Sequence, residues 1–137
     1  MPVFDPKYFK KKSKVNRVVE RKLENKLKAW KLGRDYYDGD RNDGYGGFTY
    51  DARWLKLLPR FIKKYKLNKN SKILDLGCKK GFIMKDLKIL IPKAKIYGIE
   101  DHYYPIKNAE KEVRQNIIYS NYYKIPFKKK YFDLVIG

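Results

Sequence analysis

The sequence predicts an α/β fold built on a parallel sheet, and three observations carry this prediction. An apolar run at 73–76 breaks at Gly77. An amphipathic segment begins after Gly81 and leads into a second apolar run at 96–99. This second run ends at once in the acidic pair 100–101. A strand, a glycine turn, a helix and a strand that ends in acid form the βαβ unit that cradles a nucleotide.

The other segments extend this unit into one α/β domain with helices on its N-terminal side. Apolar residues that recur at helical spacing predict helices, and short apolar runs bounded by turn residues predict strands. The expected elements are helices at about 13–30, 54–65 and 82–91 and from Pro105, and two further strands at 117–119 and 132–136.

Residues 1–33 are expected to form a basic arm followed by an amphipathic helix. The first 14 residues are rich in Lys and punctuated by Pro, and an apolar stripe then recurs at helical spacing up to a predicted stop at Gly33. We expect this helix to pack on the domain through its stripe, in preference to lying on a membrane or an RNA. The main domain then spans residues 34–137. The stripe consists of Val15, Val19, Leu23, Leu27 and Trp30.

Residues 34–54 are dense in Asp, Gly and Tyr and show no sustained period, which predicts a long loop. Its glycines permit left-handed backbone, and aromatic residues such as Tyr45 supply flat faces with polar tips. A loop of this length in a compact domain is more often functional than filler. Two interpretations stand: the loop covers an adenosine-like ligand or a polar substrate, or it is an aromatic-pinned Ω-loop with a structural role only.

The composition limits the classes of function. The net charge of +19 attracts RNA, acidic membranes or anionic substrates, but no Arg-rich cluster or RNA-binding signature accompanies it, so a bias in composition is the favoured explanation. Cys78 and His102 are the only residues of their kinds, which excludes an internal disulfide framework and a His/Cys zinc site. No apolar run approaches the ~20 residues that span a bilayer, and no secretory signal opens the chain. We therefore expect a cytoplasmic protein without a resident metal.

The candidate nucleotide-binding residues lie at the carboxyl ends of the first two predicted strands. A side chain at Gly77 would collide with a bound nucleoside, and Gly81 opens the helix where a Cβ would crowd. Asp75 can accept backbone N–H groups of the glycine turn or meet an amino group of the ligand. Glu100 can accept both hydroxyls of a ribose. The dinucleotide pattern GxGxxG is not met and no P-loop is present, which excludes those two classes.

This segment resembles motif I of the class I S-adenosylmethionine-dependent methyltransferases, D/E-x-G-x-G-x-G. Here it runs Asp75-Leu76-Gly77-Cys78-Lys79-Lys80-Gly81, with Lys79 at the place of the usual middle glycine. Residues 120–136 are similar, without gaps, to the family's G-D-A-x-x-L-P-F-x-x-x-x-F-D-L-V-I. Residues 34–54 look like a bacterial branch with a GYGG loop before motif I. The resemblance covers about residues 34–137.

The resemblance implies a Rossmann-like methyltransferase fold, S-adenosylmethionine as cofactor and no need for a metal. Asn121 stands where the family has an aspartate close to the adenine amino group, and no catalytic residue is assigned. The family's sheet has the order 3-2-1-4-5-7-6, and this chain supplies 3-2-1-4, so the fourth strand is expected to be an apolar edge open to another chain. The implied cofactor-binding residues are Asp75, Gly77, Cys78, Gly81, Glu100, Asp101, Asn121 and Tyr45.

Three functions stay open at this stage. The chain is a methyltransferase, or the cofactor-binding portion of one, with an unidentified acceptor; a non-catalytic cofactor-binding module; or a basic RNA-binding protein. Within the site, Cys78 is expected to be a small packing residue of the turn rather than a nucleophile. His102 is expected to be a solvent-facing loop residue.

Overall fold

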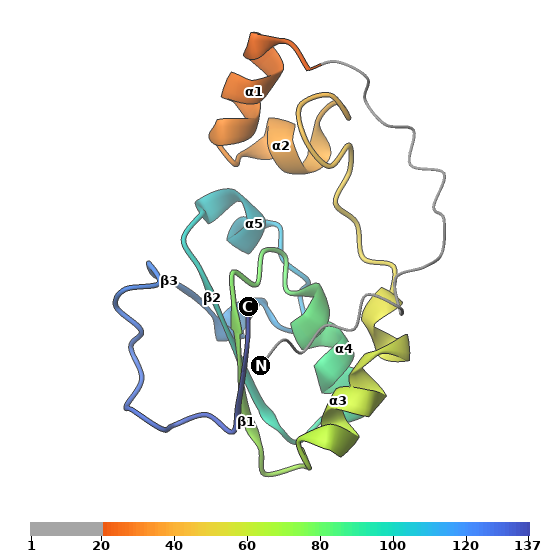
Figure 1. The fold of residues 1–137 in the computed structure, drawn as a ribbon, viewed down its shortest axis with the longest axis vertical. Helices are drawn as coiled ribbons and strands as arrows, with labels where there is room; N and C mark the ends of the chain where they lie inside the picture. Colours follow the sequence, from red (N-terminus) through yellow and green to blue (C-terminus); the bar gives the residue numbers. More distant parts are fainter. Residues whose placement is uncertain (1–20) are drawn as a thin grey trace.

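A four-stranded parallel sheet with the order β3-β2-β1-β4 forms the centre of the computed structural model, which describes residues 21–137 (Figure 1). The predicted α/β class and the strand order 3-2-1-4 of a Rossmann-like methyltransferase fold are confirmed. The strands are β1 (Lys72–Leu76), β2 (Lys95–Glu100), β3 (Ile117–Tyr119) and β4 (Leu134–Ile136). The α-helices are α1 (Leu23–Trp30), α2 (Arg34–Asp38), α3 (Leu58–Lys64), α4 (Phe82–Leu90) and α5 (Tyr103–Lys107), and the 3-10 helices are η2 (Arg53–Lys56) and η3 (Arg114–Asn116).

The central strand β1 is buried on both faces. It pairs with β2 on one side, where Ile73 lies opposite Ile96, and with β4 on the other, where Ile73 lies opposite Leu134. Ile73 and Leu74 point to opposite faces of the sheet, and both are almost fully buried. Such a doubly covered strand is typical of parallel sheets, and it explains why Ile73 and Leu74, which point to opposite faces, are both apolar.

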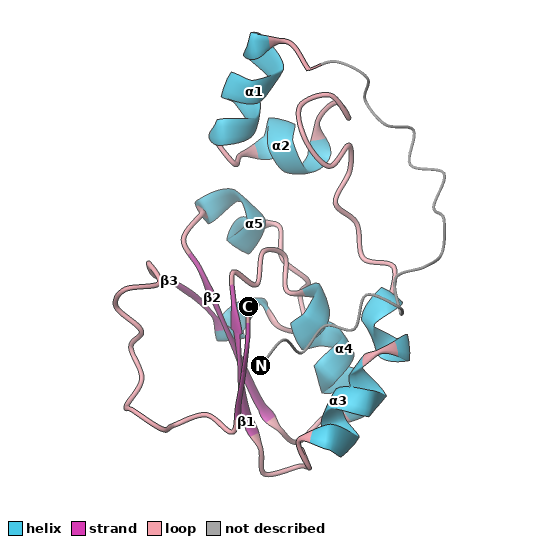
Figure 2. Ribbon diagram, viewed as in Figure 1, coloured by secondary structure: helices cyan, strands magenta, loops and turns pink. Residues whose placement is uncertain are grey.

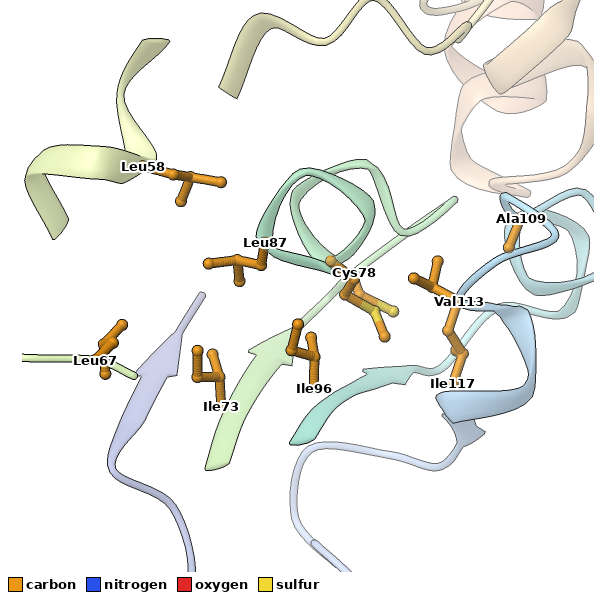
Figure 3. Close-up of a cluster of buried hydrophobic side chains, with 10 residues drawn as sticks. Leu58, Leu67, Ile73, Cys78, Leu87, Ile96, Ala109, Val113 and Ile117 are labelled. Carbon is orange, nitrogen blue, oxygen red and sulfur yellow. The ribbon is translucent and has the colours of Figure 1, made fainter. Parts of the chain in front are cut away.

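Helices α3 and α4 cover one face of the sheet, and the long β3–β4 connection runs over the other (Figure 2). On the helical face, Ile73 and Ile96 of the strands and Leu87 of α4 belong to one cluster of buried side chains (Figure 3). On the other face, Tyr97 of β2 lies 5.2 Å from Phe127, centroid to centroid. The aromatic residues of the β3–β4 connection therefore cover this second face of the sheet, as helices α3 and α4 cover the first.

Three predicted boundaries are wrong in detail. The helix predicted at 54–65 is divided into η2 and α3, since Pro59 lies in the first turn of α3 and has no N–H to continue the preceding helix. A short helix, α2, lies inside the predicted loop 34–54. The helix from Pro105 ends already at Lys107.

The predicted packing of the N-terminal helix is also wrong. Its start falls outside the described residues, and the part that is described, α1, leaves Leu23, Leu27 and Trp30 exposed, with Trp30 at 84%. The helix is held by polar contacts instead, because the buried Asp43 carboxylate accepts a hydrogen bond of 2.8 Å from Asn25. A buried carboxylate requires such partners, so the polar face of α1 is the one turned inward.

Within residues 21–137, no helix combines the length and the apolarity that crossing a bilayer demands.

Candidate cofactor-binding site

The glycine turn between β1 and α4 adopts a backbone that favours glycine at both predicted positions. Gly77 has φ +70 and Gly81, the N-cap of α4, has φ +77. A Cβ on Gly81 would stand 2.8 Å from Val113 Cγ2, so the predicted crowding at this residue comes from the protein's own core. At Gly77 the nearest group to such a Cβ is the Tyr122 hydroxyl, at 3.5 Å.

Asp75 lies at the end of β1 as predicted, with 4% of its surface exposed. Within the described part of the chain it accepts no hydrogen bond and forms no ion pair, so it does not orient the glycine turn. Burial, with a smaller contribution from the negative charge of Glu100, raises the pKa of Asp75 to about 7. The Asp75 carboxyl thus lines a cavity without a hydrogen bond or ion pair to the described residues, and the charge of Lys79 partly opposes the rise of its pKa.

This cavity, which we call the β1 cavity, has a volume of about 620 Å³. Asp75 and the turn Gly77–Lys79 form one wall, and the loop segment with Tyr45 and Phe48 forms another. Aromatic faces and an acid therefore meet in one hollow, as a nucleoside with a charged tail requires. This placement of Tyr45 is consistent with the interpretation in which the loop at 34–54, which we call the Gly/Tyr loop, covers a ligand.

Glu100 lies at the tip of β2 and is 2% exposed. Its Oε2 accepts the backbone N–H of Lys79 at 2.9 Å, and its Oε1 accepts those of Asp101 and His102, both at 3.1 Å. Glu100 is thus the residue that orients the glycine turn, a role that the sequence suggested for Asp75. Because a carboxylate offers roughly four acceptor positions, Oε2 retains capacity for a ligand hydroxyl.

A second cavity, of about 320 Å³, lies beside β3 and brings Asp101 and Asn121 together. Asn121 Oδ1 accepts the backbone N–H groups of Tyr123 and Lys124 at 3.1 and 3.0 Å. Its carbonyl oxygen is therefore engaged in a local turn. The Tyr122 hydroxyl donates to Asp101 at 3.1 Å, and this places Tyr122 between the two cavities.

Cys78 is buried and belongs to the hydrophobic core beneath the turn (Figure 3). A Cβ on Gly98 would come within 2.5 Å of Cys78 Sγ, so strand β2 is glycine at this point because the thiol fills the space. Burial, followed by the charges of Asp75 and Glu100, raises the pKa of the Cys78 thiol. A thiol held neutral agrees with a packing role.

His102 is less solvent-facing than expected. Its Nδ1 lies 3.2 Å from Glu100 Oε1 and 2.5 Å from Asp101 Oδ1, and the ring is one third exposed. Together these three side chains offer ligand atoms within 4.8 Å of one another. Glu100 Oε1 already accepts two backbone N–H groups and Asp101 is in contact with the His102 ring, so the histidine contact explains the cluster.

The Gly/Tyr loop is anchored by a contact that the sequence did not reveal. The buried Lys80 ammonium donates to both oxygens of Asp38 at 2.7 Å and to the Phe48 carbonyl at 2.9 Å, and Tyr104 OH donates to Asp38 at 2.7 Å. Burial acts to raise the pKa of Asp38, but the hydrogen bonds from Lys80 and Tyr104 outweigh it and the pKa lies below its ordinary value. Lys80 belongs to the glycine turn and Asp38 to α2, so this ion pair fixes the loop over the site.

A second anchor joins the same loop to α4. Tyr50 OH donates a short hydrogen bond to Asp86, and the other carboxylate oxygen of Asp86 accepts the Trp54 backbone N–H at 3.1 Å. Asp86 is fully buried in the middle of an apolar helix face. A charged residue at a core position of the amphipathic pattern was the one sequence signal for this contact.

Comparisons with known proteins agree with this geometry. A family model described as "Methyltransferase domain" matches residues 74–136. A malonyl-[acyl-carrier protein] O-methyltransferase of Legionella pneumophila is 33% identical over 89 residues, which cover 62% of this chain. A ribosomal RNA small subunit methyltransferase C of Buchnera aphidicola is 36% identical over 71 residues, or 48% of the chain.

The chain is much shorter than these relatives. The matched residues span 28% of the length of the Legionella protein and 20% of that of the Buchnera protein. Among solved structures, a SAM-dependent methyltransferase from Aquifex aeolicus aligns with 64% of this chain and 56% of its own, at 22% identity and a TM-score of 0.45.

A parallel sheet in the order 3-2-1-4 with a glycine turn after β1 and an acid after β2 defines a nucleotide-binding α/β protein. The family match agrees with this class, since residues 74–136 are similar to a methyltransferase domain.

Proposed function

We propose that this chain binds S-adenosylmethionine and serves methyl transfer. The observation that carries the proposal is the Asp75 carboxyl, which is buried at the end of β1, has no hydrogen bond or ion pair with residues 21–137 and lines the β1 cavity. A buried acid without a partner is costly, and a cationic ligand group would remove that cost. The ammonium group of the cofactor's amino-acid end is such a group.

The site residues predicted from the sequence would contact different parts of the ligand, which would extend from one cavity to the other. Asp75, with the turn residues Gly77 and Cys78, would border the amino-acid end, with Tyr45 on the opposite wall, whereas Gly81 faces the core and shapes the turn. Glu100 would accept a ribose hydroxyl through the remaining capacity of Oε2, and Asp101 and Asn121 would border the adenine. Since the carbonyl of Asn121 is engaged, its Nδ2 is the group left to donate to the base.

The bound cofactor would supply a methyl group activated by a positive sulfur. The protein's contribution is then to hold that methyl in line with a nucleophile and to exclude water. Residues 21–137 show no nucleophile–base pair that would carry a catalytic step, so no catalytic residue is proposed. The two relatives are named for different acceptors, and the acceptor class of this chain is left open.

Titration calorimetry with S-adenosylhomocysteine tests cofactor binding. We expect wild-type protein to bind and Asp75→Asn to lose at least about tenfold in affinity, because the variant lacks the charge that meets the ligand's ammonium. Asp35→Asn, at an exposed acid of α2, is the matched control and should bind as wild type does. Absence of binding by the wild-type chain would overturn the proposal.

A second candidate function, RNA binding, is favoured by the net charge of +19 and by the likeness to a ribosomal RNA methyltransferase. Binding to a structured RNA should then weaken steeply with salt, as release of several counterions requires. An RNA affinity that survives 0.5 M salt unchanged, or no affinity at all, would remove this candidate. With the methyltransferase function we also propose that the protein is cytoplasmic and that its chain consists of an N-terminal arm and helix, residues 1–33, and a cofactor-binding domain, residues 34–137.

A partner for the sheet is part of the proposal as well. One edge of β4 is unpaired within residues 21–137, and an apolar cavity of about 280 Å³ lined by Trp54, Phe61 and Val135 adjoins it. A further strand that pairs with β4 would cover both.

A further inference from the structure

Lys79 occupies the place of the middle glycine of motif I, and its backbone keeps the glycine conformation. Its φ is +53, in the left-handed region that a lysine rarely adopts. The conformation alone does not single it out, since Leu32, Ala52, Lys66 and Lys130 also have positive φ. What distinguishes Lys79 is where its side chain lies.

The Lys79 ammonium lies at the wall of the β1 cavity, held by the Gly/Tyr loop. Its Nζ donates to the Tyr45 hydroxyl at 2.6 Å and stands 5.2 and 5.7 Å from the ring centroids of Tyr45 and Phe48. One of its three N–H groups is used in this way, which leaves two for a ligand. No carboxylate of the described residues lies within ion-pair distance of it.

The other cations at this cavity are already engaged. Arg41 donates to the carbonyl of Gly44 at 2.6 Å, and Arg53 forms an ion pair with Asp51 at 2.7 Å. Of the described cations that line the cavity, Lys79 is therefore the one without an anionic or carbonyl partner. Among the described acids that line the cavity, Asp75 is the one without an ion pair, and the charge of Lys79 acts to lower its pKa without forming an ion pair with it.

We propose that the Lys79 ammonium, positioned by Tyr45, binds the carboxylate of the ligand's amino-acid end. An α-amino acid carries an ammonium and a carboxylate on one carbon, and the Asp75 and Lys79 charges in one cavity are complementary to that pair. This inference rests on the proposed function and adds a chain-specific residue to it. It also gives a reason for a lysine at a left-handed position, where strain is tolerated because the residue contacts a ligand.

The inference predicts a preference for ligands that carry the carboxylate. S-Adenosylhomocysteine has it, decarboxylated S-adenosylmethionine has the amine alone, and 5′-methylthioadenosine has neither. Lys79→Gly removes the charge and restores the residue that the backbone favours, so loss of folding is not expected. Lys79→Met keeps the backbone strain and removes only the charge.

The test is calorimetric titration of the full chain with these three ligands. Both variants should lose about tenfold or more in affinity for S-adenosylhomocysteine, as loss of a charge-assisted hydrogen bond predicts, and keep their affinity for decarboxylated S-adenosylmethionine and 5′-methylthioadenosine. Lys130→Gly is the control, because it makes the same replacement at φ +58 on an exposed turn. It should leave all three affinities unchanged.

Two kinds of outcome would overturn the inference. If Lys79→Gly binds S-adenosylhomocysteine as tightly as wild type, or loses affinity equally for all three ligands, Lys79 does not recognise the carboxylate. If wild type binds none of the ligands, the proposed cofactor binding itself fails and the inference falls with it. The response of 5′-methylthioadenosine separates these cases, since it reports the nucleoside subsite alone.

Discussion

At the scale of the residue, Asp75 couples the stability of the fold to pH. Its carboxyl has an ordinary pKa of 3.8 and a pKa of about 7 in the folded protein, chiefly because of burial. The folded state therefore favours the protonated acid. The associated stability is fully present below pH 4 and is lost as the pH rises to about 7, over a range on the order of 4 kcal/mol.

Asp75→Asn should remove this dependence, because the amide stays neutral at every pH. The difference in the free energy of unfolding, variant minus wild type, is expected to be about 2–3 kcal/mol larger at pH 8 than at pH 5, so that the variant gains in relative stability as the pH rises. Urea titrations at the two pH values measure the difference, with Asp35→Asn as the exposed control. A constant gap between variant and wild type would show that Asp75 is ionised in the folded protein throughout.

At the scale of the element, the Lys80–Asp38 ion pair decides whether the Gly/Tyr loop stays on the sheet. Lys80→Met leaves the Asp38 carboxylate, which is 26% exposed, without its ammonium partner, and loss of this charge-assisted contact should cost about 1–3 kcal/mol. We expect residues 34–52 to exchange their amide hydrogens much faster in the variant, while β1 and β2 keep their protection. Lys69→Met, at an exposed lysine before β1, is the matched control.

The parts predicted well from the sequence are those whose signal is local. The glycine turn and the acid after β2 follow from residues close together in the chain, and a short apolar run identifies each strand. The strand order is implied by the resemblance to the methyltransferase family. The Lys80–Asp38 contact joins residues that are 42 positions apart in the sequence. Nothing in the local sequence around either residue indicates this partner. The sequence also did not show that Glu100, and not Asp75, orients the glycine turn. This contact is not local either, because it is the parallel pairing of β1 and β2 that brings Glu100 to the Lys79 N–H.

For α1, in contrast, the sequence pattern was local and clear, but the packing predicted from its apolar stripe was wrong. Helical periodicity predicts which residues share a face, but it does not say what that face meets. Here the buried Asp43 attracts Asn25 and Lys28, and the stripe turns outward. A polar group that must be satisfied on burial thus outweighed the periodic pattern.

At the scale of the whole molecule, the sheet has one apolar edge that residues 21–137 leave open. Val135 in β4 is 50% exposed, and the adjoining apolar cavity is lined by residues of η2, α3 and β4. An unpaired apolar edge strand promotes pairing with another chain. We expect the protein to self-associate with increasing concentration in sedimentation velocity experiments.

A charge on that edge should suppress the association. Val135→Lys is expected to shift the protein toward the monomer, because a lysine disfavours edge-to-edge pairing. Tyr119→Lys places the same charge on β3, at the other side of the sheet, where the side chain is 65% exposed. If both substitutions shift the distribution equally, net charge and not the β4 edge controls association.

Alkylation of the buried Cys78 thiol can report how often the protein opens locally around the glycine turn. Alkylation requires a thiolate and access, and both are denied while β1 and β2 hold Cys78 against Gly98. Because Cys78 is the single cysteine, every labelled molecule has opened at the glycine turn at least once. Labelling with iodoacetamide should thus be slow in the native protein, slower still with S-adenosylhomocysteine, and complete in urea. The rate gives the opening free energy of the site directly; fast labelling of native protein would contradict the structure.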